Sequence, residues 1–315
     1  MATPRVTCII TNYNYAQFLA DAIDSVLIQT FHSFELIIVD DGSTDQSHDI
    51  LSRYEADGRI IIVRQPNAGQ AAAFNRGFEA SSGKYIAFLD ADDRWLPEKL
   101  TRVVAAFERE ADASLVYHRL YREAGDGGRL GRPWPRPLLK GDISRLVLRS
   151  GGWWPYPGTS GLSFAREFLE NVMPIPAEQN RICADAYLAD LSPFFGHIVP
   201  LAEPLGVYRL HASNLWTSPA RLAKKEETRP AHIKHYEHRV DSINSVLAAR
   251  GRTERVTLEK HWPYQRLLWD SNIRRRSFWA MARLAFTFPA EPRLYVRARA
   301  ALGVIRSALF ARGQR

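Results

Sequence analysis

The segment YIAFLDADDRWLP, residues 85 to 97, passes from a hydrophobic run directly into Asp90, Asp92 and Asp93. A hydrophobic run without polar alternation is typical of a strand that is buried on both faces, as in a parallel sheet. Three earlier runs, rich in β-branched residues, have the same character: Val6 to Ile10, Leu36 to Val39 and Ile60 to Val63. We therefore expect four buried strands, the last of which ends in carboxylates.

Helical patterns separate these runs. Apolar residues follow helical spacing from Leu19 to Leu27, and further helices are expected over residues 44–54, 69–80 and 97–109. The alternation predicts an α/β fold with a doubly wound, mostly parallel sheet flanked by helices. Ligands of such sheets bind beyond the carboxyl ends of the strands, where the strand order reverses. The polar clusters expected at this edge are residues 11–14, 40–43, 66–69 and 90–92.

Length, composition and charge describe a globular protein with a basic end. The 315 residues suffice for one large domain and an extension, and 46% are hydrophobic and 24% charged. The net charge is +8, but eleven arginines and only two acidic residues lie between Gln265 and Arg315, so residues 1–264 are nearly neutral. A nearly neutral main domain argues against nucleic-acid binding.

The pattern changes twice along the chain. After about residue 110 the strand-like segments are shorter and their connections rich in Pro and Gly, and from about residue 216 the sequence is helical and basic. We expect a main domain over 1–215, with halves at 1–110 and 111–215, and a basic helical extension over 216–315. The first residues lack the apolar core of a signal peptide, and no run of about 18 apolar residues occurs. We therefore expect a cytoplasmic protein that does not span a membrane.

The carboxylates of residues 90–93 point to a cation. Carboxylates held together at a strand end repel each other, and a divalent ion relieves that repulsion. Oxygen ligands select Mg²⁺, Mn²⁺ or Ca²⁺, and a site with one or two carboxylates leaves positions open for phosphate oxygens. The glycine-rich motifs of P-loop and dinucleotide-binding proteins are absent from the sequence. The implied ligand is a metal-bound diphosphate, and a solvated acidic loop is the alternative.

The segments CIITNYNYAQFLADAIDSVLIQTFHSFELIIVDDGSTDQS (residues 8–47) and PNAGQAAAFNRGFEASSGKYIAFLDADDRW (residues 66–95) resemble the family-2 glycosyltransferases, which have the GT-A fold. The resemblance is dense over residues 5–110 and thin up to about 215. It implies an inverting transfer of a sugar from a nucleoside-diphosphate sugar to an acceptor hydroxyl, in cell-surface polysaccharide or glycolipid synthesis, with Mn²⁺ or Mg²⁺ as cofactor. The first half of the main domain would bind the nucleotide sugar and the second half the acceptor.

The resemblance also implies roles for single residues. Tyr13 would stack on the base, Asp41 would accept a hydrogen bond from a base N–H, and Asp90 would lie near the ribose. Asp92 would be the main metal ligand. The alternatives are a half-buried loop aromatic for Tyr13 and a helix cap for Asp41. The other implied nucleotide-binding residues are Thr11, Asn67, Gly69 and Gln70, of which Asn67 and Gly69 also suit a plain turn. Structural roles are expected for Asp40 and Arg76.

The implied general base lies in ICADAYLADL, residues 182–191, where Asp185 matches the family's catalytic aspartate. Ala184 departs from the family, which normally has Glu there, and Asp190 is the second choice. Farther on, YRLHASN (residues 208–214) resembles the family's Tyr-Arg-x-His element, in which His211 would lie near the metal or the diphosphate. Three aromatic residues could stack on an acceptor sugar or fill the core: Trp153, Trp154 and Tyr156.

The basic end carries an amphipathic helix pattern. Such a helix either packs against its own domain or lies in the interface of an anionic membrane. The second alternative would suit a saccharide acceptor linked to lipid and a peripheral position of the protein on the inner membrane face. Two other functions stay open: a sugar nucleotidyltransferase, whose glycine-rich basic signature is missing, and a non-catalytic nucleotide-sugar-binding protein, suggested by Ala184. The apolar stripe is Leu294, Ala298, Ala301, Leu302, Ile305 and Leu309, with Arg293, Arg297 and Arg306 alongside.

Overall fold

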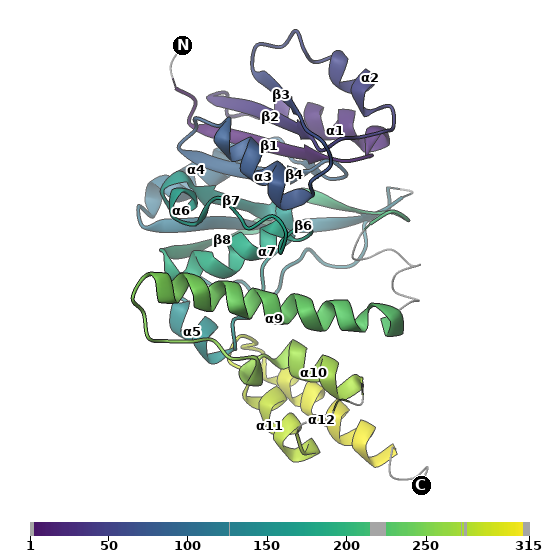
Figure 1. The fold of residues 1–315 in the computed structure, drawn as a ribbon, viewed down its shortest axis with the longest axis vertical. Coiled ribbons are helices and arrows are strands. Elements are labelled where there is room, and N and C mark those ends of the chain that lie inside the picture. The colour runs from purple at the N-terminus through teal and green to yellow at the C-terminus, as the bar shows by residue number, and fades with distance from the viewer. Residues whose placement is uncertain (1–2, 126, 215–224, 272, 274–275, 311–315) are drawn as a thin grey trace. The chain divides into compact units, whose positions relative to one another are not determined.

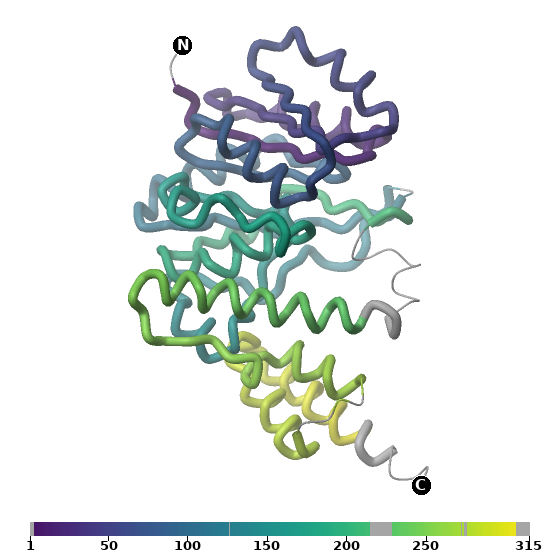
Figure 2. The backbone as a smooth tube through the Cα atoms, viewed as in Figure 1, coloured from purple at the N-terminus to yellow at the C-terminus, as the bar shows by residue number. Residues whose placement is uncertain are grey.

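The computed structural model describes residues 3–125, 127–214, 225–271, 273 and 276–310. The chain forms two compact units, which we call the sheet unit (Met1–Asp142 and Tyr156–Asn214) and the helical unit (Ile143–Pro155 and Leu215–Arg315). Figure 1 shows the elements of each, and Figure 2 traces the chain through them. The helical unit thus includes residues 143–155, a segment that the sequence pattern places within the main domain.

The elements alternate between strand and helix up to β4, and the order is more varied afterwards. The strands are β1 Val6–Asn12, β2 Phe34–Asp40, β3 Ile60–Arg64, β4 Tyr85–Asp90, β5 Arg94–Trp95, β6 Ala113–Ala124, β7 Leu162–Ala165 and β8 His197–Leu210. The helices are α1 Ala16–Leu27, α2 Ser47–Ser52, α3 Gln70–Glu79, α4 Lys99–Arg109, α5 Ser144–Arg149, η1 Thr159–Gly161, α6 Arg166–Val172, α7 Ala184–Leu191, η2 Ser192–Phe194, α9 Lys225–Ala249, η3 Leu258–Lys260, α10 Trp262–Asp270, α11 Phe278–Thr287 and α12 Leu294–Phe310.

The sheet has the strand order β3-β2-β1-β4-β7-β6-β8-β5. The four strands predicted from the sequence are its parallel part, because β2 pairs with β1 and β3, and β1 pairs with β4, all in parallel. The chain leaves β1 toward β2 and β3 and then returns to β4 on the other side, so the strand order reverses between β1 and β4. The register places Thr11 beside Asp90 and Asn12 beside Asp40. The polar strand ends therefore meet at one edge, as predicted.

Helices cover both faces of this parallel part, because its strands are apolar on both sides. On one face Cys8 and Ile10 belong to a core that also contains buried residues of α1, α2 and α4. On the other face the rings of Phe74 in α3 and Phe88 in β4 stack 4.1 Å apart. Gly77 lets α3 approach closely, since a Cβ there would lie 2.7 Å from the side chain of Ile9. The predicted layered α/β arrangement is confirmed.

The second half of the sheet mixes directions. β7 runs antiparallel to β4 and β6, whereas β6 and β8 are parallel. Residues 91–93, which we call the acidic segment, connect β4 to the short strand β5. Strand β5 pairs with Gly206 and Val207 of β8. This pairing brings the end of β8, which continues into residues 209–214, beside the acidic segment. The tertiary structure thus places His211 next to residues that precede it by more than a hundred positions.

The helical unit contains α5, α9, η3 and α10 to α12 (Figure 1). Segment 143–155 is part of its packing: a Cβ on Gly151 would lie 2.5 Å from the carbonyl oxygen of Thr257, and the Trp153 ring lies 5.4 Å from Phe288. Trp154 is buried. Of the two interpretations of these tryptophans, core packing is the one that the structure supports. A further cluster joins α10, α11 and α12: Trp269, Met281, Ala282, Ala285, Ala301 and Val304.

Candidate active site

Three carboxylates gather where β4 ends. Ligand oxygens of Asp90, Asp92 and Asp93 lie within 4.8 Å of one another, and Asp92 and Asp93 are buried. Burial raises the pKa of Asp90 and of Asp93 well above the usual range for a carboxyl group, and the charge of Asp92 raises both further. The cluster is therefore electrostatically unfavourable by itself. A set of hard carboxylate oxygens this close together fits Mg²⁺ or Mn²⁺, which would neutralise it.

Asp92 is tied to the end of β8. Its Oδ2 lies 2.9 Å from His211 Nε2 and accepts a hydrogen bond of 3.3 Å from Asn214 Nδ2. The other ring nitrogen of His211, Nδ1, lies 2.8 Å from Ser213 Oγ. The two residues assigned to the metal by resemblance are thus brought into direct contact. Asn214 was not singled out from the sequence, although its place three residues after His211 in the YRLHASN segment is the signal that could have identified it.

Asp93 is held through both of its oxygens. Ser160 Oγ donates to Oδ2 at 2.5 Å, and the backbone N–H of Arg209 donates to Oδ1 at 3.0 Å. Ser160 Oγ also accepts a hydrogen bond from the backbone N–H of Asp90. A carboxylate with both oxygens engaged in this way anchors its surroundings. Asp93 therefore fixes β8 and η1 against the acidic segment.

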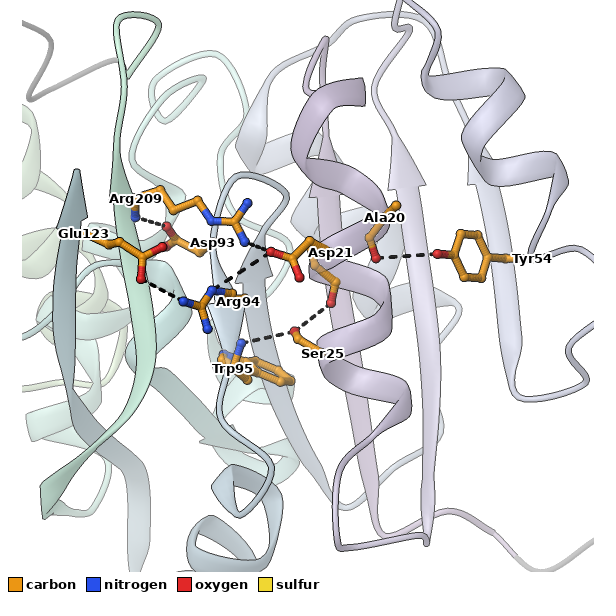
Figure 3. Close-up of polar contacts among 10 residues, drawn as sticks. Ala20, Asp21, Ser25, Tyr54, Asp93, Arg94, Trp95, Glu123 and Arg209 are labelled. Atoms are coloured by element: carbon orange, nitrogen blue, oxygen red, sulfur yellow. Dashed lines mark hydrogen bonds and ion pairs between the residues drawn. The ribbon is translucent and has the colours of Figure 1, made fainter. Parts of the chain in front are cut away.

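Arg209 and its neighbours form an ionic network around this anchor (Figure 3). The Arg209 guanidinium pairs with Asp21 of α1 and lies 5.4 Å from the ring of Phe18, one turn earlier on the same helix. Arg94 of β5 bridges the same Asp21, at 4.0 Å, and Glu123 of β6, at 2.7 Å. The network connects α1, β5, β6 and the end of β8, and no local sequence pattern indicates it.

Helix α1 also contacts His211 directly. The Phe18 ring lies 4.7 Å from the imidazole and the Tyr15 ring 5.7 Å, the latter in an edge-on arrangement. Burial raises the pKa of Tyr15, and the charges of Asp92 and Asp90 raise it further. His211 therefore stands between the carboxylate of Asp92 and two aromatic rings, which restrict its orientation.

Gln70 connects the acidic cluster to α7. Its Nε2 donates to Asp90 Oδ1 at 3.3 Å and to Thr159 Oγ1 at 3.4 Å, while its Oε1 accepts from the backbone N–H of Ala184 at 3.0 Å. Its own N–H donates to the carbonyl oxygen of Arg181. The N-terminus of α7 is thus capped from a different helix, since the local cap residue, Cys183, makes no side-chain cap bond.

Asp185 lies in the first turn of α7, directly after the residue that Gln70 caps. It is half-buried, and its negative charge contributes to the raised pKa of Asp90, so the two carboxylates lie within electrostatic range. Asp190, the second choice for the base, is buried and accepts a hydrogen bond from Tyr156. Asp190 and Tyr156 therefore take part in packing α7 against its neighbours.

The loop between β3 and α3 is shaped by Asp41. The Asp41 carboxylate accepts hydrogen bonds from the Gln65 side chain at 2.7 Å and from the backbone N–H groups of Ala68 and Gly69, both at 2.8 Å. It therefore does not cap α2, which was the structural alternative from the sequence. Three bonds use most of the roughly four acceptor positions of a carboxylate and leave about one for a further donor.

The same loop approaches the segment before α7. Asn67 accepts a hydrogen bond from the Arg181 guanidinium, and a Cβ on Gly69 would lie 2.4 Å from Arg181 Cγ. With a φ of +91°, Gly69 also has a backbone conformation that favours glycine. Arg76 points elsewhere and pairs with Glu79 on the exposed side of α3. Asn67 and Gly69 thus bring α3 and α7 together at the sheet edge.

Thr11 and Tyr13 flank the other side of this edge. Thr11 is half-buried at the end of β1, between Val39 and Asp90 in the register. Tyr13 is 46% exposed in the loop that follows. Asp40 receives hydrogen bonds from Asn12 and Ser43 and has the structural role expected for it. An exposed ring beside these strand ends is available for stacking.

Across the part of the chain that the structure describes, we find no helix with the length and apolarity needed to span a bilayer. All the site residues considered above belong to the sheet unit. Most come from the ends of β1, β2, β4 and β8 and from the starts of α3 and α7, and α1, β5, β6 and η1 supply the residues that support them.

Comparisons with known proteins identify the chain's relatives. The profile of glycosyl transferase family 2 matches residues 7–169. An uncharacterized glycosyltransferase from Nostoc sp. is 37% identical over 306 residues, which cover 94% of this chain and 93% of the relative. The putative glycosyltransferase EpsH of Bacillus subtilis is 36% identical over 226 residues, or 68% of this chain and 63% of the relative.

Solved structures share the fold. S. aureus TarS, residues 1–349, in complex with UDP-GlcNAc superimposes with a TM-score of 0.56 at 17% identity, over 98% of this chain and 92% of that TarS chain. The mannosyltransferase PcManGT from Pyrobaculum calidifontis, in complex with GDP-Man and Mn²⁺, gives a TM-score of 0.54 at 20% identity, over 98% and 81%. The predicted GT-A fold is confirmed, and the chain belongs to glycosyltransferase family 2.

Proposed function

We propose that this family-2 glycosyltransferase is metal-dependent and inverting, and moves a sugar from a nucleoside-diphosphate sugar to an acceptor hydroxyl. The observation that carries the proposal is the carboxylate cluster at the end of β4, which Gln70 links to the helix that bears Asp185. A nucleotide-sugar donor with a divalent metal is further supported by the fold's similarity to TarS bound to UDP-GlcNAc and PcManGT bound to GDP-Man and Mn²⁺.

The donor would lie across the strand ends. Tyr13 stacks on the base, Thr11 lines its pocket, and Asp41 accepts a base N–H in its remaining acceptor position. Asp90 lies near the ribose. The loop with Asn67, Gly69 and Gln70 borders the donor on the side of α3 and α7.

Asp92, with His211 beside it, would hold the metal, Mn²⁺ or Mg²⁺, which would supply positive charge for the diphosphate leaving group. Asp185 accepts the proton of the acceptor hydroxyl as that oxygen attacks the anomeric carbon. The new C–O bond forms on the face opposite the breaking bond to phosphate, whose electron pair leaves with the diphosphate. The configuration at the anomeric carbon is therefore inverted.

The acceptor is a saccharide or a lipid-linked saccharide, and the pathway is the synthesis of a cell-surface polysaccharide or glycolipid. Support comes from a relative in Bacillus subtilis, the putative teichuronic acid biosynthesis glycosyltransferase TuaG, which is 39% identical over 125 residues, or 39% of this chain and 50% of TuaG. The protein acts in the cytoplasm, peripherally at the inner membrane face. Within the sheet unit, residues 1–110 hold most of the donor, and residues 111–142 and 156–214 hold the acceptor and supply His211.

The proposal is tested by a thermal-shift screen of sugar nucleotides with Mn²⁺, with Mg²⁺ and with a chelator. A ligand present at about 100 times its Kd adds about 2.7 kcal/mol to the free energy of unfolding, enough for a clear rise in Tm. We expect a rise that needs metal and is lost in Asp92→Asn. The control is Asp57→Asn, a surface carboxylate paired with Arg59, which keeps the rise.

Transfer is then measured with the donor that gives the largest shift. Formation of an inverted glycoside that requires metal supports the proposal. Undiminished donor binding by Asp92→Asn in chelator, or a retained anomeric configuration in the product, contradicts it.

A further inference from the structure

The outward face of α11 presents aromatic rings around an arginine. Trp279 is 66% exposed and Phe286 46% exposed, and Arg283, also exposed, lies between them. Their spacing of four and three residues places all three on one side of the helix. A tryptophan this exposed is uncommon, because burying so large an apolar surface is favourable.

Helix α12 repeats the arrangement. Tyr295 is 69% exposed and Leu302 58% exposed, and the exposed arginines Arg299 and Arg306 alternate with them. The spacings are four, three and four residues, so this set also shares one side of its helix. Both helices therefore carry the same pattern of a large apolar residue next to an arginine.

The opposite faces of the two helices are already in use. Met281, Ala282 and Ala285 of α11 pack in one cluster with Ala301 and Val304 of α12. The single apolar stripe expected from the sequence is thus divided: Ala301 is buried, whereas Leu302 and Leu294 are exposed. The side chain of Leu309 lies outside the described residues.

The charge on this pair of helices is positive. Glu291 is already bound to Arg293 at 2.7 Å, and Asp270, at the end of α10, to Arg266 at 2.9 Å. Within the described ranges no ion pair forms to the three outward arginines, Arg283, Arg299 and Arg306. The outward faces thus combine uncompensated positive charge with exposed rings and a leucine.

We propose that the outward faces of α11 and α12 form a docking surface for an anionic lipid bilayer. Arginines reach lipid phosphates at the headgroup level, Trp and Tyr favour the interface, and Phe and Leu enter the acyl boundary. A polyanion such as nucleic acid would pair with the arginines but leave the apolar residues in water. The surface deepens the proposed function, since it places the enzyme where a lipid-linked acceptor resides, but it does not depend on the transfer chemistry.

The test is flotation of the full-length protein with vesicles of phosphatidylcholine alone or mixed with phosphatidylglycerol. We expect binding to the anionic vesicles only. Each arginine near an anionic surface contributes about a factor of five, so the triple variant Arg283→Gln, Arg299→Gln, Arg306→Gln should bind about 100-fold more weakly. A matched control, Arg53→Gln, Arg102→Gln, Arg109→Gln, removes the same charge from exposed positions of the sheet unit and should keep binding.

The apolar part is tested by the double variant Trp279→Ser, Leu302→Ser, which should weaken vesicle binding. Its control is the double variant Ile28→Ser, Ile61→Ser, which replaces exposed apolar residues of the sheet unit and should keep vesicle binding. Substitution is preferable to deletion of 288–315, because deletion uncovers Met281, Ala282 and Ala285. Circular dichroism checks that each variant is folded, and the metal-dependent thermal shift by donor checks the transferase site separately.

Three results overturn the proposal: no binding to anionic vesicles, equal binding to neutral ones, or equal loss in the control variants. If the wild type sediments as a dimer and the Trp279→Ser, Leu302→Ser variant as a monomer, the surface instead binds a second copy of the chain. If the wild type floats with anionic vesicles but shows no metal-dependent thermal shift with any donor, the proposed function is contradicted and the membrane surface is not.

Discussion

At the scale of single residues, the site is built from side chains that connect separate elements. Asp92 contacts both His211 and Asn214, and Gln70 spans from Asp90 to the N-terminus of α7. A residue that only lines a pocket tolerates substitution, whereas one that bridges two elements sets their distance.

We expect Asp185→Asn to lower kcat for sugar transfer by about 100- to 10,000-fold, the usual contribution of a general base. Asparagine has nearly the same shape but cannot take the proton of the acceptor hydroxyl. Donor affinity, measured by calorimetry in Mn²⁺, should stay within about twofold. The comparison is Asp190→Asn, which alters a buried contact with Tyr156 and should lower Tm instead. Full activity of Asp185→Asn would exclude it as the base.

We expect Gln70→Met to lower kcat by about 10- to 100-fold, because a small displacement of α7 misplaces Asp185. Methionine has a similar volume but can replace neither the bond to Asp90 nor that to Ala184. Steady-state kinetics should assign most of the loss to kcat rather than to the donor KM.

The matched control is Gln29→Met, a buried glutamine that bridges Ser25, Leu96 and Leu100 away from the site. It should lower Tm and leave kcat unchanged. The bridging role of Gln70 is disproved if both variants lose stability and neither changes the kinetics.

The buried Lys99 makes the free energy of unfolding depend on pH. It is fully buried, its Nζ donates to Ser163 Oγ at 3.1 Å, and burial lowers its pKa to about 7, from about 10.5 in the unfolded chain. Between these values the unfolded chain holds more protons than the folded one, so the free energy of unfolding rises with pH. Lys99→Met should remove up to about 2 kcal/mol of this rise between about pH 7 and about pH 8.5.

Urea unfolding of both proteins across this pH window provides the measurement. Burial raises the pKa of the Cys8 thiol to about 12, but both proteins carry this thiol, so its ionisation in the unfolded chain cancels in the comparison. Parallel pH profiles for the wild type and Lys99→Met would contradict the prediction.

At the scale of elements, α1 holds the end of β8. Phe18 contacts His211 and lies near Arg209, and Asp21, one turn later, pairs with Arg209. Because β8 also binds Asp93 through the Arg209 N–H, one face of α1 sets the place of the histidine relative to the carboxylate cluster. The sequence pattern accounts for α1 as a helix but not for this contact.

We expect Phe18→Ala to raise the Mn²⁺ concentration for half-maximal activity by about 10-fold, since groups behind a metal ligand commonly contribute 10- to 100-fold in affinity. The reason is that His211 gains orientational freedom when the ring is removed. Asp21→Asn should have less effect, because exposed ion pairs contribute at most about 1 kcal/mol. Metal titration of activity distinguishes the two, and equal effects would show that the ring contact is unimportant.

At the scale of the whole molecule, the chain crosses from one unit to the other and back. Residues 143–155 interrupt the sheet unit in the sequence and belong to the helical unit, where Gly151 and Trp153 pack. The remaining residues of the helical unit are 215–315. The helical unit is therefore not a continuous tail, and the boundary near residue 215 that the composition indicates describes only part of it.

We expect a fragment of residues 215–315 to lack cooperative unfolding, because it has no segment 143–155 to pack against Thr257 and Phe288. Joining residues 143–155 to that fragment through a Gly/Ser linker should restore a single thermal transition, followed by circular dichroism. A cooperative transition in the shorter fragment would mean that the inserted segment is dispensable.

The sequence by itself determined the parallel half of the sheet, because buried strands and amphipathic helices each have a local pattern that propensity and periodicity encode. It also determined the acidic strand end and, through resemblance, the residues proposed for the donor. These features lie within short stretches of chain. Ala184, the departure from the family pattern, proved to be the residue whose N–H Gln70 binds, a role that the backbone provides whatever the side chain.

Only the tertiary structure decided which distant residues meet. The contacts of Gln70 with Ala184, of Arg209 with Asp21 and of segment 143–155 with the rest of the helical unit join residues that are more than a hundred positions apart. Such contacts depend on strand order and on the direction of the second half of the sheet, which no local pattern fixes. The same holds for α12, where packing against α11 selected which part of the apolar stripe is buried and which faces outward.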